Sequence, residues 1–457
     1  MKEWSEQFGK QFGFMEGGTP VLVSSDPDLL QEVFIKQFAS STRKLFALSP
    51  EPDDDPVHVF AAQGARWKRL RTISTPMFTA NRMRQMQPFV HSSLEEFLAI
   101  VGEKAEGGAT FDIFPHLQRL TLDVIAKVAL GYEMSVQKGA GREFYDTVKA
   151  VNSGPPFSGN NFFGTCAALL PETKAVWRRL VEWRVRLFGD VAFHTIRSRV
   201  AAVVAERRKN MASREGKVKD FIDLMLDLEA EEGWSQQQGT EENSMLRVDK
   251  KVTSAEVVAQ MMIILLAGYE TTSSALAFLT YELAKSPDVQ QELYQEITEN
   301  IEKEEDINYD SVVKLKFLDA VINESLRLYP VASSVVTRKC SQQTLISGQK
   351  IPAGLFIAAN VWSIHHDPQL WGDDATSFRP SRMLEKEGRH PMAFMPFGIG
   401  PRLCLGMRFA LLEMKLCIAH LLFRYRLKAA PETPEKLKLV GSTTVAPEKV
   451  PIQLEAR

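Results

Sequence analysis

The chain has 457 residues, of which 44% are hydrophobic and 25% charged, and its net charge at pH 7 is -2. This composition is typical of a soluble globular protein, and the balanced charge excludes the electrostatic attraction on which nucleic-acid-binding proteins depend. We therefore expect no nucleic-acid partner. Length alone suggests about three domains of ordinary size.

The cysteine content narrows the class of protein further. The chain has four cysteines, and no two of them form a C-x-x-C pair. The spacing predicts neither a disulfide framework nor a zinc knuckle, and it indicates reduced thiols in a cytosol-facing protein. Cys166, Cys340 and Cys417 have the sequence surroundings of ordinary buried thiols, whereas Cys404 does not.

Segments that meet a membrane are scarce in this sequence. The first residues, "MKEWSEQFGKQFGF", contain no apolar run long enough for a signal peptide. No window approaches the roughly 18 apolar residues that span a bilayer, so we expect no membrane crossing. The apolar, turn-rich segment from Ser153 to Pro171 has two interpretations: it dips into a lipid surface, or it is a buried loop.

The amino-terminal half is mainly helical in pattern. "TPVLVSS", residues 19–25, has the pattern of a strand, and several helical patterns follow between Gly64 and Ala230. In "ARWKRLR", Trp67 and Arg71 are four residues apart, which is typical of an amphipathic helix with a basic face. The polar stretch 231–251 is either a domain linker or a surface loop inside one large helical fold.

One long helix stands out in the middle of the chain. Thr253 and Glu256 form a capping box, and Pro287 marks the end of a helix about 50 Å long. Its middle, Met261–Ala267, is apolar on every face, which predicts burial on all sides. In the "AGYETTS" stretch that follows, Glu270 and Thr271 alone favour a satisfied polar pair or a bend caused by the threonine.

The region after the central helix predicts two helices and then a hairpin. The helical patterns cover residues 287–305 and 310–329, and Glu324 and Arg327 are spaced as an ordinary surface salt bridge. "TLISGQKIPAGLFIAANV", residues 344–361, is punctuated like a hairpin. We expect this hairpin and the early strand 19–25 to share one small sheet.

The stretch "FGIGPRLCLG", residues 397–406, places Cys404 among three glycines, just before a helical pattern that runs from Leu405 to about Arg424. Glycines let the backbone approach something large and flat, and a helix N-terminus stabilises a thiolate, so the sulfur suits a metal ligand. A dinucleotide-binding loop is the first alternative, but Leu403 occupies the place of the third glycine and no strand precedes the loop. A cysteine nucleophile is the second, although no activating histidine is identifiable.

"FGIGPRLCLG" resembles the haem-binding signature F-x-x-G-x-R-x-C-x-G of the cytochrome P-450 family. The resemblance implies that Cys404 is the axial thiolate of haem b, that Arg402 pairs with a haem propionate, and that Phe397 packs beside the sulfur, with Gly406 closing the motif. It also implies a mainly α fold with a small β region, a long central helix over the haem, and one catalytic domain over residues 1–457.

Three further motifs carry the same resemblance. The pattern A-G-x-E/D-T-T is matched by Ala267, Gly268, Glu270, Thr271 and Thr272, which implies a proton relay through Glu270 and Thr271 and room for dioxygen at Gly268.

The motif W-x-x-x-R assigns Trp67 and Arg71 to a haem propionate, with Arg338 and Arg43 as additional partners.

The third motif, E-x-x-R, implies that Glu324 and Arg327 form a buried structural pair completed by Arg382 of "FRPSRM". The family usually reads P-E-R-F at that place. This chain has Ser381 and Met383 in place of the acid and the aromatic residue.

The resemblance implies a haem-thiolate monooxygenase that inserts one atom of the co-substrate dioxygen into an apolar organic molecule of xenobiotic, steroid or fatty-acid type. The family positions predict substrate contacts on the central helix, after the Glu324 helix and near the end of the chain: Met262, Ile263, Leu266, Ala267, Ala332 to Val335, and Ser442 to Val445 with Thr444. A peroxide isomerase of the same fold and a non-catalytic haem-binding protein remain as alternatives.

The chain contains no flavin or nicotinamide motif, so the expected electron donor is an NADPH-dependent cytochrome P-450 reductase, with a b-type cytochrome as a second candidate. Lys68, Arg69, Arg408 and Lys415 form either a basic face for an acidic donor or ordinary solvated charge. The residues of these motifs are most similar to those of animal microsomal members, and this resemblance implies that the protein lies at the cytosolic face of the endoplasmic reticulum. The amino-terminal anchor of those members is not recognisable here, which leaves soluble protein or peripheral membrane contact.

Overall fold

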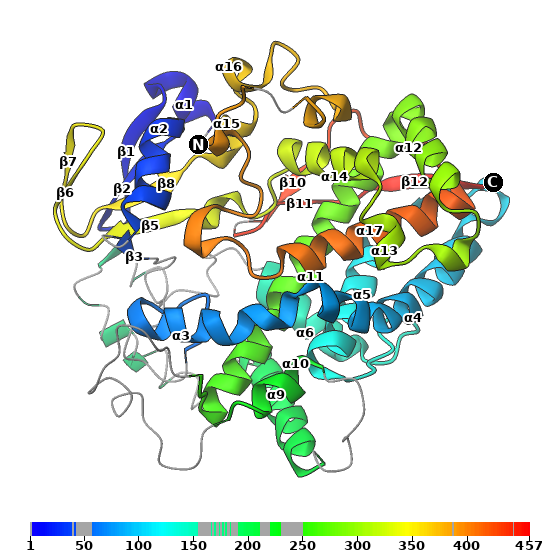
Figure 1. Cartoon of the computed structure of the whole chain (residues 1–457), viewed down its shortest axis with the longest axis horizontal. Coiled ribbons are helices and arrows are strands. Elements are labelled where there is room, and N and C mark those ends of the chain that lie inside the picture. The colour runs from blue at the N-terminus through cyan, green and yellow to red at the C-terminus, as the bar shows by residue number, and fades with distance from the viewer. Residues whose placement is uncertain are drawn as a thin grey trace.

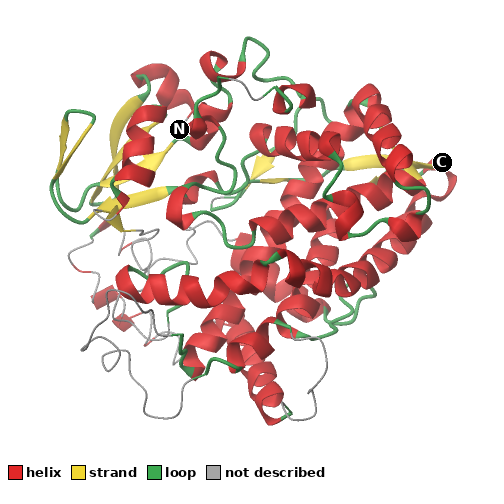
Figure 2. Cartoon of the chain, viewed as in Figure 1, coloured by secondary structure: helices red, strands yellow, loops and turns green. Residues whose placement is uncertain are grey.

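The computed structural model describes residues 2–38, 41–42, 57–153, 166, 169–170, 173, 176–177, 179–180, 183, 191–210, 220–229, 250–385, 388–441 and 443–457. The fold is mainly α-helical with small sheets, as the resemblance predicts, and helices pack together on one side while most strands gather on the other (Figures 1 and 2). The described helices are α1 Lys2–Phe8, α2 Pro27–Gln31, α3 Gly64–Ser74, α4 Ala80–Ala105, α5 Phe114–Ile125, α6 Arg142–Ser153, α9 Val191–Lys209, α10 Phe221–Leu226, α11 Ser254–Lys285, α12 Pro287–Asn300, α13 Tyr309–Val312, α14 Lys316–Leu328, α15 Val361–His365, α16 Pro368–Trp371 and α17 Met407–Arg424.

Within the part of the chain that the structure describes, the strands form four small sheets. The largest has the order β1-β2-β8-β5-β3, a second has the order β4-β12-β9, and β6-β7 and β10-β11 are two-stranded. The strands are β1 Gln11–Glu16, β2 Thr19–Ser24, β3 Ser41–Thr42, β4 Phe111–Asp112, β5 Thr337–Cys340, β6 Thr344–Ile346, β7 Gln349–Ile351, β8 Phe356–Ala359, β9 Tyr425–Ala429, β10 Leu439–Val440, β11 Ala446–Pro447 and β12 Pro451–Ala456. Strand β2 pairs in parallel with β8, so the sharing of one sheet by strand 19–25 and the segment 344–361 is confirmed for the end of that segment, whereas its hairpin β6–β7 forms a separate sheet.

Helix α11 runs through the centre of the helical side (Figure 1). Its capping box is present: the Thr253 side chain accepts a hydrogen bond from the Glu256 N–H, and the Glu256 carboxylate accepts one from the Thr253 N–H. Helices α5, α9, α14 and α17 all contact it. These neighbours bury the apolar middle of α11, as the sequence predicts.

The expectation that no window resembles a membrane span is wrong for this same helix. Among the described helices, α11 has the length and hydropathy of a bilayer-crossing segment. In the structure 67% of its most apolar window is buried inside the protein, because α11 is the core helix around which the others pack.

Three predicted helix boundaries differ from the observed ones. The helix predicted over 287–305 ends at Asn300, where Ile301 turns to an extended conformation. The helix predicted over 310–329 is two helices, because Asn308 caps α13 and the Glu296 carboxylate accepts hydrogen bonds from Phe317 N and Leu318 N at the start of α14. Helix α17 begins at Met407, two positions after the predicted start at Leu405.

Some predictions lie on residues that the structure does not describe. Arg43 and Ser442 lie outside the described residues, as does most of the segments 153–171 and 231–251. The additional propionate partner, one substrate contact, the lipid-facing loop and the linker therefore stay predictions.

Candidate haem site

A large interior cavity lies between α11, α3, α17 and the cysteine loop, residues 397–406. Its empty space is about 1560 Å³, including the space at its mouth. Its lining includes residues from three of the four motifs, together with predicted substrate contacts and the predicted propionate partner Arg338: Trp67, Arg71, Ile263, Ala267, Gly268, Thr271, Thr272, Ala332, Val335, Arg338, Phe397, Arg402, Cys404 and Gly406.

The cysteine loop is folded back on itself by its own backbone. The Cys404 N–H donates to the Phe397 carbonyl oxygen at 2.9 Å, and Leu403 N donates to Gly400 O at 2.9 Å. Gly400 has φ +70°, and a Cβ there would overlap the Phe34 carbonyl, so glycine is needed for the loop to pack against the chain near β2. The Cys404 side chain is exposed on the cavity side, just before the positive end of α17.

The wall around the loop is strongly basic. Among the described lining residues three are arginines, Arg71, Arg338 and Arg402, and none is an aspartate or glutamate. Burial lowers the pKa of the Arg71 guanidinium, and the charge of the Cys404 sulfur opposes that change. A cavity whose described lining has three cations, a cysteine sulfur and no acid suits an occupant that carries its own negative groups and a metal, as haem does.

The aromatic residue of the W-x-x-x-R motif contacts one of these cations. The Arg402 guanidinium lies 4.2 Å from the centre of the Trp67 ring and donates a hydrogen bond to Ala62 O at 2.8 Å. Trp67 and Arg71 both point from α3 into the cavity. Arg402 of the cysteine loop therefore contacts Trp67 of α3. Neither the haem-binding signature nor the W-x-x-x-R motif indicates this contact by its spacing.

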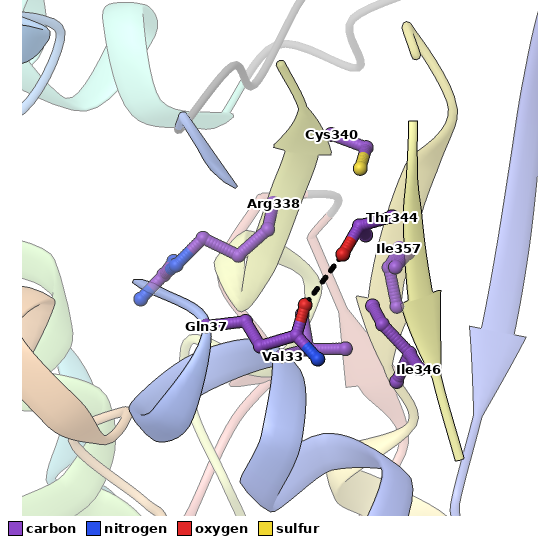
Figure 3. A pocket seen from close by; sticks show the side chains of 7 residues that line it. All are labelled: Val33, Gln37, Arg338, Cys340, Thr344, Ile346 and Ile357. Carbon is purple, nitrogen blue, oxygen red and sulfur yellow. Dashed lines mark hydrogen bonds between the residues drawn. The ribbon is translucent and has the colours of Figure 1, made fainter. Parts of the chain in front are cut away.

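Arg338 reaches the cavity from the β side. Its guanidinium lies 4.5 Å from the centre of the Phe34 ring, and it donates to the Thr337 carbonyl at 2.8 Å. Figure 3 shows its side chain extending away from a small pocket of about 230 Å³, across which the Thr344 hydroxyl donates to the Gln37 side chain at 2.7 Å. Arg338 therefore forms part of the wall between this pocket and the large cavity.

The opposite wall is formed by one face of α11. Ala267 and Thr271 lie on it, and the Thr271 hydroxyl donates to the Ala267 carbonyl oxygen at 2.7 Å. Gly268 also lines the cavity, and a Cβ at this position would lie 2.8 Å from Ile125 of α5. Close helix packing is thus a second reason for this glycine, beside the predicted room for dioxygen.

Glu270 does not line the cavity, although its neighbour in sequence does. Its carboxyl interacts with the Thr444 hydroxyl from the β10–β11 turn. Burial raises the pKa of Glu270, and the Thr444 hydroxyl opposes the rise. The acid is therefore held behind the face that carries Thr271.

The predicted substrate contacts divide into two groups. Ile263, Ala267, Ala332 and Val335 line the cavity. Met262 lies in the hydrophobic core with 5% exposure, Leu266 packs against that core, and Thr444 lies beside Glu270. The turn that carries Thr444 is bound to the segment after α14 by hydrogen bonds from Ser334 Oγ to Thr443 O at 2.6 Å and from Val445 N to Val331 O at 2.7 Å.

A buried charge network lies behind the cysteine loop. Glu324 accepts hydrogen bonds from Arg327 Nη2 and Arg382 Nε, both at 2.8 Å, and all three side chains are at most 1% exposed. Asp374 accepts from Arg382 at 2.9 Å, which supplies the second acid that the "FRPSRM" stretch lacks. Met383 packs with Trp371 in place of the usual aromatic residue.

The prediction that Arg69 and Lys415 contribute to a basic surface is wrong. Arg69 is 5% exposed and donates to the Glu256 carboxylate at 2.6 and 3.0 Å. Lys415 is 5% exposed, and its ammonium lies 2.8 Å from Asp319. Helical periodicity showed a basic face but not that these two cations are buried and paired with acids, whereas Lys68 and Arg408 are exposed.

Several lining residues were missed because they carry no motif. Ile125 comes from α5, Phe78 from the turn after α3, and Phe409 and Met414 from α17. Each is an apolar residue in a helical pattern, and nothing in the sequence separates it from the core. His365 also carries no motif, and no cluster suited to a metal ion occurs among the described His, Cys, Asp and Glu side chains.

The similarity to known proteins agrees with this site. The family model described as cytochrome P-450 matches residues 1–456. The chain is 36% identical over 468 residues to CYP13A3 and 35% identical over 476 residues to cyp-13B1, two Caenorhabditis elegans proteins named as cytochromes P-450. The alignments cover 100% of this chain and 88% and 89% of those relatives. The chain therefore belongs to the cytochrome P-450 family of haem-thiolate monooxygenases.

Proposed function

We propose that this protein holds haem b through Cys404 and oxidises apolar organic molecules with electrons from a separate NADPH-dependent reductase. The observation that carries the proposal is the cavity, in which a cysteine and three arginines without a lining acid face a largely apolar helix. We further propose that residues 1–457 work as one catalytic domain, and that the substrates are of xenobiotic, steroid or fatty-acid type.

The basic wall is the proposed binding surface for the two haem propionates. Arg71, Arg338 and Arg402 supply charge-assisted hydrogen bonds, and the Trp67 indole N–H supplies another. The Arg402 guanidinium packs on the Trp67 ring and donates a hydrogen bond to Ala62 O, so its N–H groups are oriented before the cofactor binds. When bound, the haem iron supplies dioxygen activation and insertion of one oxygen atom into the substrate.

The apolar wall is the proposed substrate site. Ile263, Ala267, Ala332 and Val335 exclude water and hold an apolar molecule by contact area, since they offer no charged group for a polar anchor. The site therefore favours neutral, hydrophobic substrates over charged ones. Leu266, Met262 and Thr444 would affect the substrate through the residues they pack against.

Thr271 and Glu270 are the proposed proton carriers. The Thr271 hydroxyl faces the cavity, while the Glu270 carboxyl lies behind it. Burial favours the protonated form of Glu270, which suits a group that must supply a proton. Thr444 orients that carboxyl from the β10–β11 turn.

The proposed redox partner is an NADPH-dependent cytochrome P-450 reductase, with a b-type cytochrome as a second donor. Exposed Lys68 and Arg408 are the proposed contacts with an acidic partner surface. The proposed location is the cytosolic face of the endoplasmic reticulum, where such a reductase and apolar substrates are both within reach.

The test is turnover of a panel of neutral apolar compounds by the purified, haem-loaded protein with reductase and NADPH. We expect oxygen consumption and a product heavier by one oxygen atom, both dependent on reductase and NADPH. Turnover of an organic peroxide without reductant would favour the isomerase alternative. Haem binding without oxygen consumption with any donor would favour a non-catalytic haem-binding protein.

A further inference from the structure

His365, the last residue of α15, joins two parts of the protein that the motifs treat separately. Its side chain is fully buried. Its Nε2 accepts a hydrogen bond from the Met395 backbone N–H at 2.9 Å, and its Nδ1 lies 3.1 Å from the Arg327 carbonyl oxygen. Because a backbone N–H can only donate, Nε2 is the bare nitrogen and the ring hydrogen sits on Nδ1, where it donates to Arg327 O.

One side of this bridge is the buried charge network. The Arg327 guanidinium donates to the His365 carbonyl oxygen at 2.7 Å, while the His365 ring donates to the Arg327 carbonyl. The two residues are thus bound to each other in both directions. Glu324 accepts two hydrogen bonds of 2.8 Å from the same guanidinium, so His365 is attached to a residue of α14 whose side chain is itself fixed.

The other side of the bridge is the chain that enters the cysteine loop. Met395 is held at both of its backbone polar groups, because its N–H donates to His365 and its carbonyl accepts from Gly398 N at 3.0 Å. The Phe394 ring stacks on the His365 ring, with centroids 5.5 Å apart. Pro396 and Phe397 follow directly, both line the cavity, and Phe397 O accepts the Cys404 N–H.

We propose that His365 is a positioning residue for Cys404. Its ring attaches the backbone at Met395 to the rigid Glu324–Arg327–Arg382 network. Because Phe397 follows closely and accepts the Cys404 N–H, this attachment fixes the position of the sulfur. The inference rests on the proposed role of Cys404 as the haem ligand. His365 touches neither the cavity nor the sulfur, and it acts through the backbone of residues 394–398.

The bridge works only with a neutral imidazole. A second proton would sit on Nε2, opposite the Met395 N–H, and would place two donors against each other. The pKa of His365 is lowered to about 3, mainly by burial and with a contribution from the charges of His366 and Arg327, while the hydrogen bond to the Arg327 backbone opposes the fall. The ring therefore stays neutral, in one tautomer, throughout the physiological range.

The experiment compares His365→Phe, which keeps a ring against Phe394 but removes both hydrogen bonds, with His365→Gln, which offers one acceptor and one donor. His366→Gln is the matched control, since His366 is the neighbouring residue and its Nδ1 lies 2.9 Å from the Trp362 carbonyl oxygen of α15 rather than bridging to the cysteine loop. Leu293→Ala in α12 is a buried variant remote from the loop, and it controls for general loss of stability.

The readout is the fraction of bound haem that gives the red-shifted Soret band of thiolate ligation in the reduced, carbon monoxide-bound protein. We expect a several-fold lower fraction in His365→Phe, partial recovery in His365→Gln, and wild-type fractions in His366→Gln and Leu293→Ala. A wild-type fraction in His365→Phe, or an equal loss in Leu293→Ala, would overturn the proposal.

A second measurement does not depend on the haem. We expect the Met395 amide of the wild-type protein to exchange its hydrogen slowly, and the same amide to exchange faster in His365→Phe. Fast exchange at Met395 in the wild type would also overturn the proposal. If the wild-type protein lacks the red-shifted band, the proposed function fails, and the exchange rates alone decide whether His365 holds the loop.

Discussion

The two walls of the cavity are held in place by different forces. The cysteine side rests on buried ions and hydrogen bonds, with Glu324, Arg327, Arg382 and His365 all at most 1% exposed. The α11 side rests on apolar packing and on one glycine, Gly268, against α5. Discrete donors and acceptors fix one geometry and tolerate little change, whereas apolar contacts tolerate swaps of similar volume. The wall that carries Cys404 should therefore be rigid, and the wall formed by α11 should be adaptable.

The largest expected effect concerns the sulfur itself. Cys404→Ala should abolish the red-shifted Soret band of the reduced, carbon monoxide-bound protein, because no other described cysteine lines the cavity. The fold should survive, since the side chain faces the cavity rather than the core. Cys417→Ala, in α17 but buried away from the cavity, should keep the band. A retained band in Cys404→Ala would show that another group binds the iron.

Breaking the network behind the loop should cost the most stability. Glu324→Gln removes the carboxylate that Arg327 and Arg382 share, although Arg382 keeps Asp374, and the free energy of unfolding should fall by about 3–5 kcal/mol. Urea titration followed by circular dichroism measures this loss. The control is Glu385→Gln, which removes an exposed partner of Arg379 and should cost about 0–1 kcal/mol. Equal losses in the two variants would contradict the contrast between the walls.

A smaller effect is expected on the adaptable wall. Gly268→Ala places a methyl group 2.8 Å from Ile125, and the crowding should lower the free energy of unfolding by about 1–3 kcal/mol. Ile125→Ala removes the opposing atoms, so the double variant should lose less than the sum of the two single losses. Additive losses would show that the two helices shift apart freely at this point.

The smallest expected effect is a pH dependence at Glu270. Since burial raises the pKa of this carboxyl, the folded chain binds its proton more tightly than the unfolded chain does. The resulting stabilisation is complete below the ordinary carboxyl pKa of about 4.5 and is lost as the pH rises through the folded pKa. The wild type should therefore lose stability relative to Glu270→Gln as the pH rises above about 4.5, as thermal unfolding of both proteins measures. A difference that runs the other way would mean that Glu270 is ionised and paired in the folded protein.

The parts that could be predicted from sequence are local. The capping box of α11 lies within a few residues, and the glycines around Cys404 determine the path of the backbone there, so both could be read directly. The partners of side chains could not be read in the same way. Arg69 and Lys415 share the spacing of surface cations, and only the fold brings Glu256 and Asp319 to them.

The same limit applies to the candidate site. Trp67, Arg71 and Arg402 carry motifs and line the cavity, but Ile125 and Met414 carry none and line it too. Glu270 and Thr271 are adjacent in sequence, yet only one of them faces the cavity, because successive residues of a helix point about 100° apart. The position of His365 depends on three distant segments, so no spacing rule could have revealed it.

The parallel pairing of β2 with β8 affects how the protein is made. A nascent chain completed through α12 already contains β2, Trp67 and Arg71, but β8, Arg338 and Cys404 have not yet left the ribosome. The β1–β2 pair must wait with the β8-facing edge of β2 unpaired, and the cavity cannot close around a cofactor. Such late, long-range contacts slow folding and leave strand edges exposed to aggregation. Supply of haem during synthesis should therefore matter most in the final stage of translation.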